Sequence, residues 1–225
     1  MEKYSNFEKS ILTILSIVGF IMVITLVSVW MNNAHIVTIQ NNVADYKKDV
    51  DGLESKIKSI MKEEQERAVV MALEEKRIDS IVTAALKRHN NMIDDRTVAE
   101  IVKEVDRKVD SIDNFNRKDI IFAIIDKETT WGTVLKSWDG SSYGAMQVHY
   151  KVWKNQCKLS SVEDLYDTNT AVDCGVDVFM IYLKKYNGDV RRALQGYRGS
   201  VNPKVNATYA DDVLRRAKLY TALNA

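Results

Sequence analysis

The chain of 225 residues contains a single proline, Pro203, and only nine glycines. Proline and glycine are the residues that most often end helices and form the turns between short strands. Their scarcity leaves long stretches in which nothing interrupts a helix, and it argues against a β-sandwich or a disordered linker-rich chain. We therefore predict an all-α protein.

The first predicted helix is an uncharged apolar run of about 21 residues, ILTILSIVGFIMVITLVSVWM, at residues 11–31. A helix of this length spans a hydrocarbon core of about 30 Å. The run ends without a small-residue cleavage site, which favours an uncleaved signal anchor over a cleaved signal peptide. Lys3 and Lys9 precede it and the next lysine is Lys47, so the positive-inside rule places residues 1–10 in the cytoplasm. The sequence thus predicts a single-pass inner-membrane protein whose remainder lies in the periplasm or at the outer face of the membrane.

Apolar residues after this run alternate in steps of three and four, the spacing of a left-handed coiled coil. They are Ile36, Ile39, Val43, Tyr46, Val50, Leu53, Ile57 and Ile60. The register fails at Glu64 and Arg67, although the chain stays helix-prone to about residue 91. We expect residues 34–91 to form a stalk or linker that pairs with identical chains. An amphipathic helix packed on its own domain is the alternative.

Charge and histidine placement exclude two classes of partner. The net charge is +1, so the chain offers no basic surface of the kind that nucleic acids require. Its three histidines, His35, His89 and His149, share no metal-ligand spacing with the cysteines. No cofactor motif is present, and we predict neither a metal nor a cofactor.

A globular domain is predicted at residues 92–225. Asp94 begins a helix with valine and isoleucine on one face, and the next helix, DIIFAIIDKE, ends in Glu128. Glu128 follows Ile121, Ile124 and Ile125 at spacings of seven, four and three, so it extends the apolar face. A carboxyl group among apolar neighbours keeps its proton longer, as general-acid catalysis on a glycosidic oxygen requires. The alternative is a helix-end glutamate that turns to solvent.

Four short motifs follow one another in this domain. They are Glu128-Thr129, then Tyr143-Gly144-Ala145-Met146-Gln147-Val148, then a helix from about Asn169-Thr170 with Gly175, and finally Ala193-Leu194-Gln195-Gly196-Tyr197-Arg198-Gly199. In this order they resemble the soluble-lytic-transglycosylase-type, goose-lysozyme-like domains over about residues 95 to 216. The resemblance implies an all-helical lysozyme-like fold, preceded here by the predicted transmembrane helix and coiled-coil stalk.

The resemblance also implies an activity. The expected reaction is cleavage of the β-1,4 bond between MurNAc and GlcNAc of peptidoglycan, with Glu128 protonating the leaving oxygen and 1,6-anhydroMurNAc as the product. A hydrolytic muramidase, in which water attacks, is the alternative. A structural coiled-coil component that only binds glycan is the rival from another class. The predicted anchor and stalk suit local wall remodelling or penetration, within a secretion, conjugation or phage assembly.

Substrate-binding residues are carried over by position within the motifs. They are Ser142, Tyr143, Gly144, Met146, Gln147, Tyr197 and Arg198. Ser137 and Ser141 compete with Ser142 for the role of the family's acetamido-contacting serine, and Tyr197 is alternatively a plain core tyrosine. Asp139 is the one obvious second carboxylate, and we expect it to cap its loop instead.

The sequence departs from the family pattern in two of the motifs. Thr129 stands where the family usually has serine, and Gly196-Tyr197-Arg198 replaces Ala-Tyr-Asn; the added cation of Arg198 favours anionic peptide stems.

Cys157 and Cys174 lie in the part of the chain predicted to leave the cytoplasm, where a disulfide is stable. Two buried free thiols are the alternative.

Overall fold

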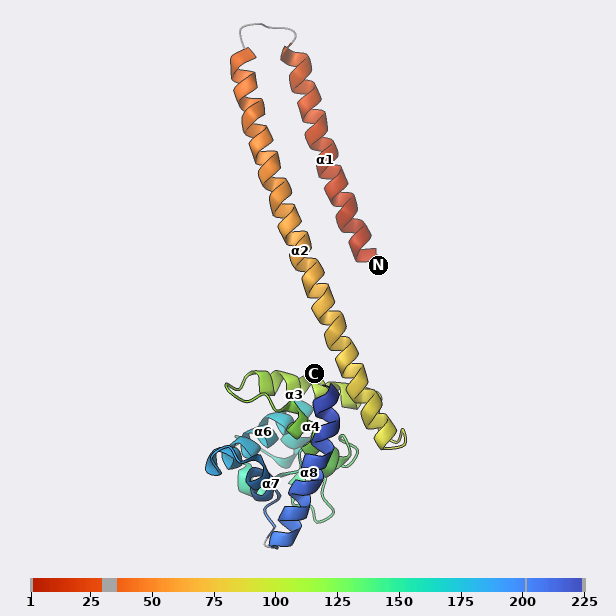
Figure 1. Ribbon diagram of the computed structural model, residues 1–225, viewed down its shortest axis with the longest axis vertical. Coiled ribbons are helices and arrows are strands. Elements are labelled where there is room, and N and C mark those ends of the chain that lie inside the picture. The colour runs from red at the N-terminus through yellow and green to blue at the C-terminus, as the bar shows by residue number, and fades with distance from the viewer. Residues whose placement is uncertain (1, 30–35, 201, 224–225) are drawn as a thin grey trace. The chain divides into compact units, whose positions relative to one another are not determined.

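The computed structural model describes residues 2–29, 36–200 and 202–223 (Figure 1). The chain divides into two compact units, Met1–Val69 and Val70–Ala225. Both units are helical, and the second carries a single short pair of strands within the described residues. The prediction of a mostly helical protein is confirmed.

The first unit contains α1 (Glu2–Val29) and the first part of α2 (Ile36–Arg88). Among the described residues, no helix is long and apolar enough to cross a membrane. Trp30 and Met31, the end of the predicted span, lie outside the described residues. The predicted placement, a single-pass inner-membrane protein with a periplasmic domain, is therefore contradicted.

Helix α2 runs without a break through the region where the heptad spacing stops. Several described positions of its predicted seam are exposed, with Val43 37%, Leu53 58% and Ile60 43% exposed, whereas Val50 and Ile57 are half-buried. Pairs of opposite charge such as Glu54 and Lys58, four residues apart, support the isolated helix by a few tenths of a kcal/mol each. A coiled coil is not shown by this single chain, and it stays a prediction.

The last turns of α2 belong to the second unit. Ile78, Ile81 and Ala85 are buried in the same hydrophobic core as Ile93 and the helices that follow. A boundary at residue 92 would leave these side chains without their core, so the predicted division of stalk from domain lies too far along the chain. The structure places the start of the C-terminal unit near Val70.

The second unit surrounds a central helix. Its elements are α3 (Asp95–Asp110), α4 (Lys118–Thr129), β1 (Ser142–Tyr143), β2 (Val148–His149), α5 (Tyr150–Trp153), η2 (Val162–Tyr166), α6 (Thr168–Lys185), α7 (Val190–Arg198) and α8 (Pro203–Leu223). Aspartates begin three of the helices: the carboxylates of Asp94, Asp167 and Asp189 accept backbone N–H groups of α3, α6 and α7. Helix α4 packs against α3 and α8, and its residues 120–125 are buried on all sides.

A buried ionic cluster joins α4 to the ends of two other helices. The Asp126 carboxylate, with no exposed side-chain surface, pairs with Arg88 Nε at 3.0 Å, His89 Nε2 at 2.5 Å and Arg216 Nη1 at 3.0 Å. Removing Asp126 would leave the partly buried guanidinium groups of Arg88 and Arg216 without this counter-charge, which costs about 3–5 kcal/mol for a buried pair. Asp126 thus holds the end of α2 and the helix α8 on α4, close to Glu128, which follows two residues later.

Candidate active site

Glu128 lies in the last turn of α4, where the helix ends abruptly. Thr129 is the last residue of α4, and the three residues after it, Thr130, Trp131 and Gly132, have left-handed φ angles of 51°, 57° and 82°. Trp131 is buried against Phe122 and Tyr220, with its indole N–H donating to the Tyr220 hydroxyl at 3.1 Å. This aromatic packing offsets the backbone strain of the turn. The turn ends the helix one residue after Glu128 and leads into the loop that forms one side of the site.

Thr129 ties the end of α4 to the hairpin. Its buried hydroxyl donates to the Ala145 carbonyl oxygen at 2.9 Å and accepts the Gly132 N–H at 3.0 Å. Ala145 lies in the segment between β1 and β2, which form a two-stranded antiparallel hairpin with Tyr143 opposite Val148. A hydroxyl at this position therefore performs a structural task, and threonine retains it in place of the usual serine.

The Glu128 side chain is half-buried and borders a cleft of about 690 Å³. Desolvation by burial raises the pKa of its carboxyl above the usual value, while the Tyr209 hydroxyl and the charges of Arg198 and Lys127 partly oppose this shift. The predicted apolar setting of Glu128 is present, since Ile121, Ile124 and Ile125 are fully buried. A raised pKa keeps a fraction of the carboxyl protonated nearer to neutral pH, as a general acid requires.

Five of the predicted site residues come together at this cleft. They are Glu128, Ser142, Gln147, Tyr197 and Arg198. They derive from α4, the β1–β2 hairpin and α7, so residues far apart in the sequence meet in one cavity. The amide nitrogen of Gln147 donates to the carbonyl oxygens of Val134 at 3.3 Å and Gly144 at 3.2 Å, which orients the side chain at the cleft.

The other three predicted residues do not border the cleft. Gly144 has φ 77°, and an added Cβ would lie 2.3 Å from the Leu165 carbonyl oxygen, so its lack of a side chain serves packing. Met146 is fully buried, and the Tyr143 hydroxyl donates to the Gly140 carbonyl oxygen at 2.6 Å. The hairpin packs on η2 at this position, and an approach of the Gly144 backbone to the glycan stays a prediction.

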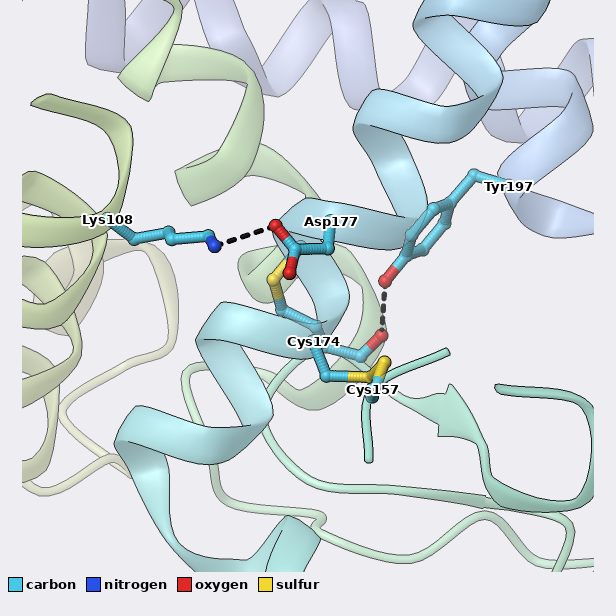
Figure 2. The surroundings of a disulfide bond; sticks show 6 residues. Lys108, Cys157, Cys174, Asp177 and Tyr197 are labelled. Carbon is cyan, nitrogen blue, oxygen red and sulfur yellow. Dashed lines mark hydrogen bonds and ion pairs between the residues drawn. A yellow bond between two sulfur atoms is a disulfide. The ribbon is translucent and has the colours of Figure 1, made fainter. Parts of the chain in front are cut away.

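Tyr197 is close to Glu128 but does not donate to it. Its hydroxyl donates to the Met146 carbonyl oxygen at 2.8 Å, the bond marked in Figure 2. Burial, and after it the negative charge of Glu128, raises the pKa of this phenol well above its usual value. Gly196, where the family has alanine, lies against Tyr182, and an added Cβ there would come within 2.5 Å of that ring. Tyr197 therefore links α7 to the hairpin at the cleft.

The loop before β1 contains Asp139 and the competing serines. Asp139 Oδ1 accepts the Ser137 hydroxyl at 2.6 Å, the Ser141 hydroxyl at 2.9 Å and the Ser141 N–H at 3.1 Å. These bonds lower the pKa of the Asp139 carboxyl to about 2. The carboxylate is thus engaged in holding its own loop. Of the three serines, Ser142 has no side-chain bond to Asp139.

Some residues at the cleft carry no sequence signal. Tyr209 comes from the first half of α8, and its buried hydroxyl lies beside the Glu128 carboxyl. This hydroxyl has no partner among the described residues at hydrogen-bond distance and angle. Lys127, Trp138 and Tyr182 also border the cavity. The helical spacing of α8 marks Tyr209 only as a core position. Within the part of the chain that the structure describes, no three His, Cys, Asp or Glu side chains gather as metal ligands.

A disulfide stabilises the hairpin side of the cleft. Cys157, after α5, is bonded to Cys174 of α6, with Cα atoms 5.3 Å apart (Figure 2). Cys174 belongs to a small hydrophobic cluster with Val148 of β2 and Leu165 of η2. The bond therefore holds the segment after the hairpin onto α6, which also pairs with α3 through Asp177 and Lys108.

The C-terminal unit is thus a helical domain with one raised-pKa carboxyl at an aromatic-walled cleft. Residues 107–215 match the family described as "Transglycosylase SLT domain". This match supports the SLT family for that part of the chain, and it points to a transglycosylase that cleaves glycosidic bonds of peptidoglycan. No curated protein matches the chain.

Proposed function

We propose that the C-terminal unit is a lytic transglycosylase that cuts the β-1,4 bond between MurNAc and GlcNAc. The observation that carries the proposal is the position of Glu128, whose pKa is raised by burial at the edge of a cleft large enough for several sugar rings. The match of residues 107–215 to the SLT domain supports the substrate class. Local remodelling of the cell wall is the role that this activity would serve.

In the proposed reaction Glu128 donates its proton to the glycosidic oxygen as the bond from C1 to that oxygen breaks. The substrate's acetamido group supports the positive charge that develops at C1. The O6 hydroxyl of the same MurNAc then bonds to C1 and returns its proton to Glu128. One C–O bond breaks and one forms, so the product is 1,6-anhydroMurNAc and no water is consumed.

Among the described residues that border the cleft, Asp139 carries the second carboxylate, and its engagement in its own loop favours this reaction over the inverting hydrolysis in which a base activates water. Asp139 is bound to Ser137 and Ser141, and its low pKa makes it a poor base. A muramidase remains the alternative, because water could take the place of O6 without a change in the residues described. A glycan-binding structural protein is the further alternative.

Four residues at the cleft are proposed to bind substrate. Ser142 is the serine whose hydroxyl is not engaged by Asp139, which supports it as the acetamido contact. Gln147 and Tyr197 border the cleft beside Glu128. Arg198 is exposed, and it borders both the cleft and an adjacent hollow that contains Lys204 and Arg215 as well as Asp211 and Asp212. This placement supports Arg198 as a contact for the carboxylates of the peptide stems.

We also propose that the first part of α2 pairs with a second copy of this chain. The argument is the run of exposed apolar residues at heptad spacing, of which Tyr46, Leu53 and Ile60 are 60%, 58% and 43% exposed. A stripe of this kind is unfavourable in water unless another helix covers it.

The test of the activity is mass spectrometry of the muropeptides that the full chain releases from purified peptidoglycan. Glu128→Gln is compared with Glu163→Gln, which removes an exposed carboxylate outside the cleft. Anhydromuramyl ends that disappear only in Glu128→Gln support the proposal. Reducing muramyl ends would assign a muramidase, and no release by the folded parent chain would favour the structural alternative.

A further inference from the structure

Trp138 is completely exposed at the border of the cleft that contains Glu128. Its relative exposure is 100%, whereas Trp131 in the same loop is 1% exposed. The Trp138 indole makes no hydrogen bond or ring contact with any described residue. An indole that stays in water forgoes about 2 kcal/mol or more of burial free energy. A ligand that covers Trp138 would gain this free energy.

The loop that carries Trp138 is held in one conformation from both sides. Asp139 accepts three hydrogen bonds from Ser137 and Ser141, and Ser137 Oγ accepts the N–H groups of Ser141 and Ser142 at 3.1 and 3.0 Å. The Tyr143 hydroxyl also donates a hydrogen bond to the Gly140 carbonyl oxygen, which holds the other end of this loop. The backbone of Trp138 is therefore fixed although its side chain packs on nothing, so only the two side-chain torsions of the indole lose freedom when a ligand covers it.

Further apolar side chains border the cleft that contains Trp138. They are Val152 of α5, which is 60% exposed, and Trp153 of the same helix. The cationic residues Lys127 and Arg198 border the cleft as well, at the Glu128 carboxyl. The cleft wall thus includes apolar and aromatic side chains and serine hydroxyls as well as charged groups, of which Lys127 and Arg198 act on Glu128.

We infer that Trp138 is a stacking platform for a pyranose ring of the glycan strand, at a subsite beyond the two sugars of the scissile bond. One face of an N-acetylhexosamine carries several C–H groups, which are attracted to the negative face of an indole ring. The inference rests on the proposed function in one respect, that the cleft takes a glycan strand. The inference assigns a sugar-binding role to Trp138, which lies outside the four sequence motifs and is not among the groups that act on the Glu128 carboxyl.

Binding is measured by calorimetry with the N-acetylglucosamine hexamer, on the full chain carrying Glu128→Gln so that the ligand is not cleaved. Trp138→Ala added to this chain is expected to weaken binding by about 5- to 10-fold, and Trp138→Phe by less. The control is Val134→Ala, which shortens a 52% exposed side chain that does not border the cleft. Thermal unfolding should be unchanged in all of them, because Trp138 makes no packing contact.

Equal affinity of the Trp138→Ala and parent chains would overturn the inference, as would a parent chain that does not bind the hexamer. Muropeptide release by the chain with Glu128 intact is measured in parallel. Release together with unaltered hexamer affinity in Trp138→Ala would reject the platform and leave the transglycosylase standing. Loss of affinity in Trp138→Ala without any release by the parent would reject the activity and keep the platform.

Discussion

The Thr129 hydroxyl donates a hydrogen bond of 2.9 Å to the carbonyl oxygen of Ala145, joining the end of helix α4 to the β1–β2 hairpin. Thr129 is the residue after Glu128, and Ala145 precedes Met146 and Gln147. A single buried hydroxyl therefore sets the distance between the proposed acid and the proposed sugar-binding strand pair.

Replacing Thr129 by valine should destabilise the domain by about 1–3 kcal/mol, because the Ala145 carbonyl and the Gly132 N–H lose their buried partner. Muropeptide release should fall with it. Urea denaturation measures the stability change. Thr129→Ser keeps the hydroxyl and should stay close to the parent in both respects; equal stability of the serine and valine variants would contradict the assigned role.

The raised pKa of Glu128 predicts a pH-dependent effect of Glu128→Gln on stability. The folded chain holds this proton more tightly than the unfolded chain, so the folded state loses stability as pH rises from the unfolded value of 4.5 through the folded pKa. Glutamine cannot ionise and escapes this loss. The melting temperature of Glu128→Gln should therefore exceed that of the parent more at pH 7 than at pH 4, while Glu163→Gln shows no such difference.

Cleavage itself should also depend on this proton. Release of muropeptides should decline as pH rises through the folded pKa of Glu128, since only the protonated acid can assist the leaving oxygen. Lys127→Gln removes a positive charge that lowers this pKa, so it should move the declining limb of the profile to higher pH. A shift in the opposite direction would contradict the electrostatic account.

Reduction of the Cys157–Cys174 bond should lower the free energy of unfolding by about 3 kcal/mol, the value expected from loop-closure entropy for a short loop. The double substitution Cys157→Ser, Cys174→Ser should show the same loss without reductant and no further change with it. Urea unfolding with and without dithiothreitol measures both. A parent chain insensitive to reductant would indicate that the bond adds no stability.

Leu53→Lys together with Ile60→Lys should convert an oligomer to a species of 25.7 kDa in light scattering after size-exclusion chromatography. The matched control is Val69→Lys, which changes a 54% exposed apolar residue of the same helix outside the seam. A parent chain that already elutes as a single copy would contradict the proposed pairing.

Arg198→Asn should reduce release from peptide-bearing peptidoglycan by about 10-fold or more, the lower end of the loss expected for one charge-assisted contact. Release from glycan strands stripped of peptides should change little. Lys103→Asn removes an equal charge from the exposed surface of α3 and serves as the control. Equal losses on both substrates would show that Arg198 acts on the sugar or on Glu128 instead.

Helical periodicity is a local property, and the sequence predicted well what depends on it. The all-helical class follows from the scarcity of proline and glycine, and the apolar setting of Glu128 follows from its spacing to Ile121, Ile124 and Ile125. The resemblance of four motifs predicted that Gln147 and Tyr197 belong to one site, and both border the cleft with Glu128.

Other features depend on which distant segments meet, and only the tertiary structure decided them. Gly144 faces the Leu165 backbone, and Tyr209 of α8 reaches Glu128, because helices α4, α6 and α8 pack around one core. The end of α2 joins that core through Ile81 and Ala85. The helical spacing of the sequence continues unbroken at this point, so it does not mark where the domain begins. The periodic pattern of an apolar helix is the same whether its face meets another helix, a membrane or water, so the sequence determined the helices and the tertiary structure decided their partners.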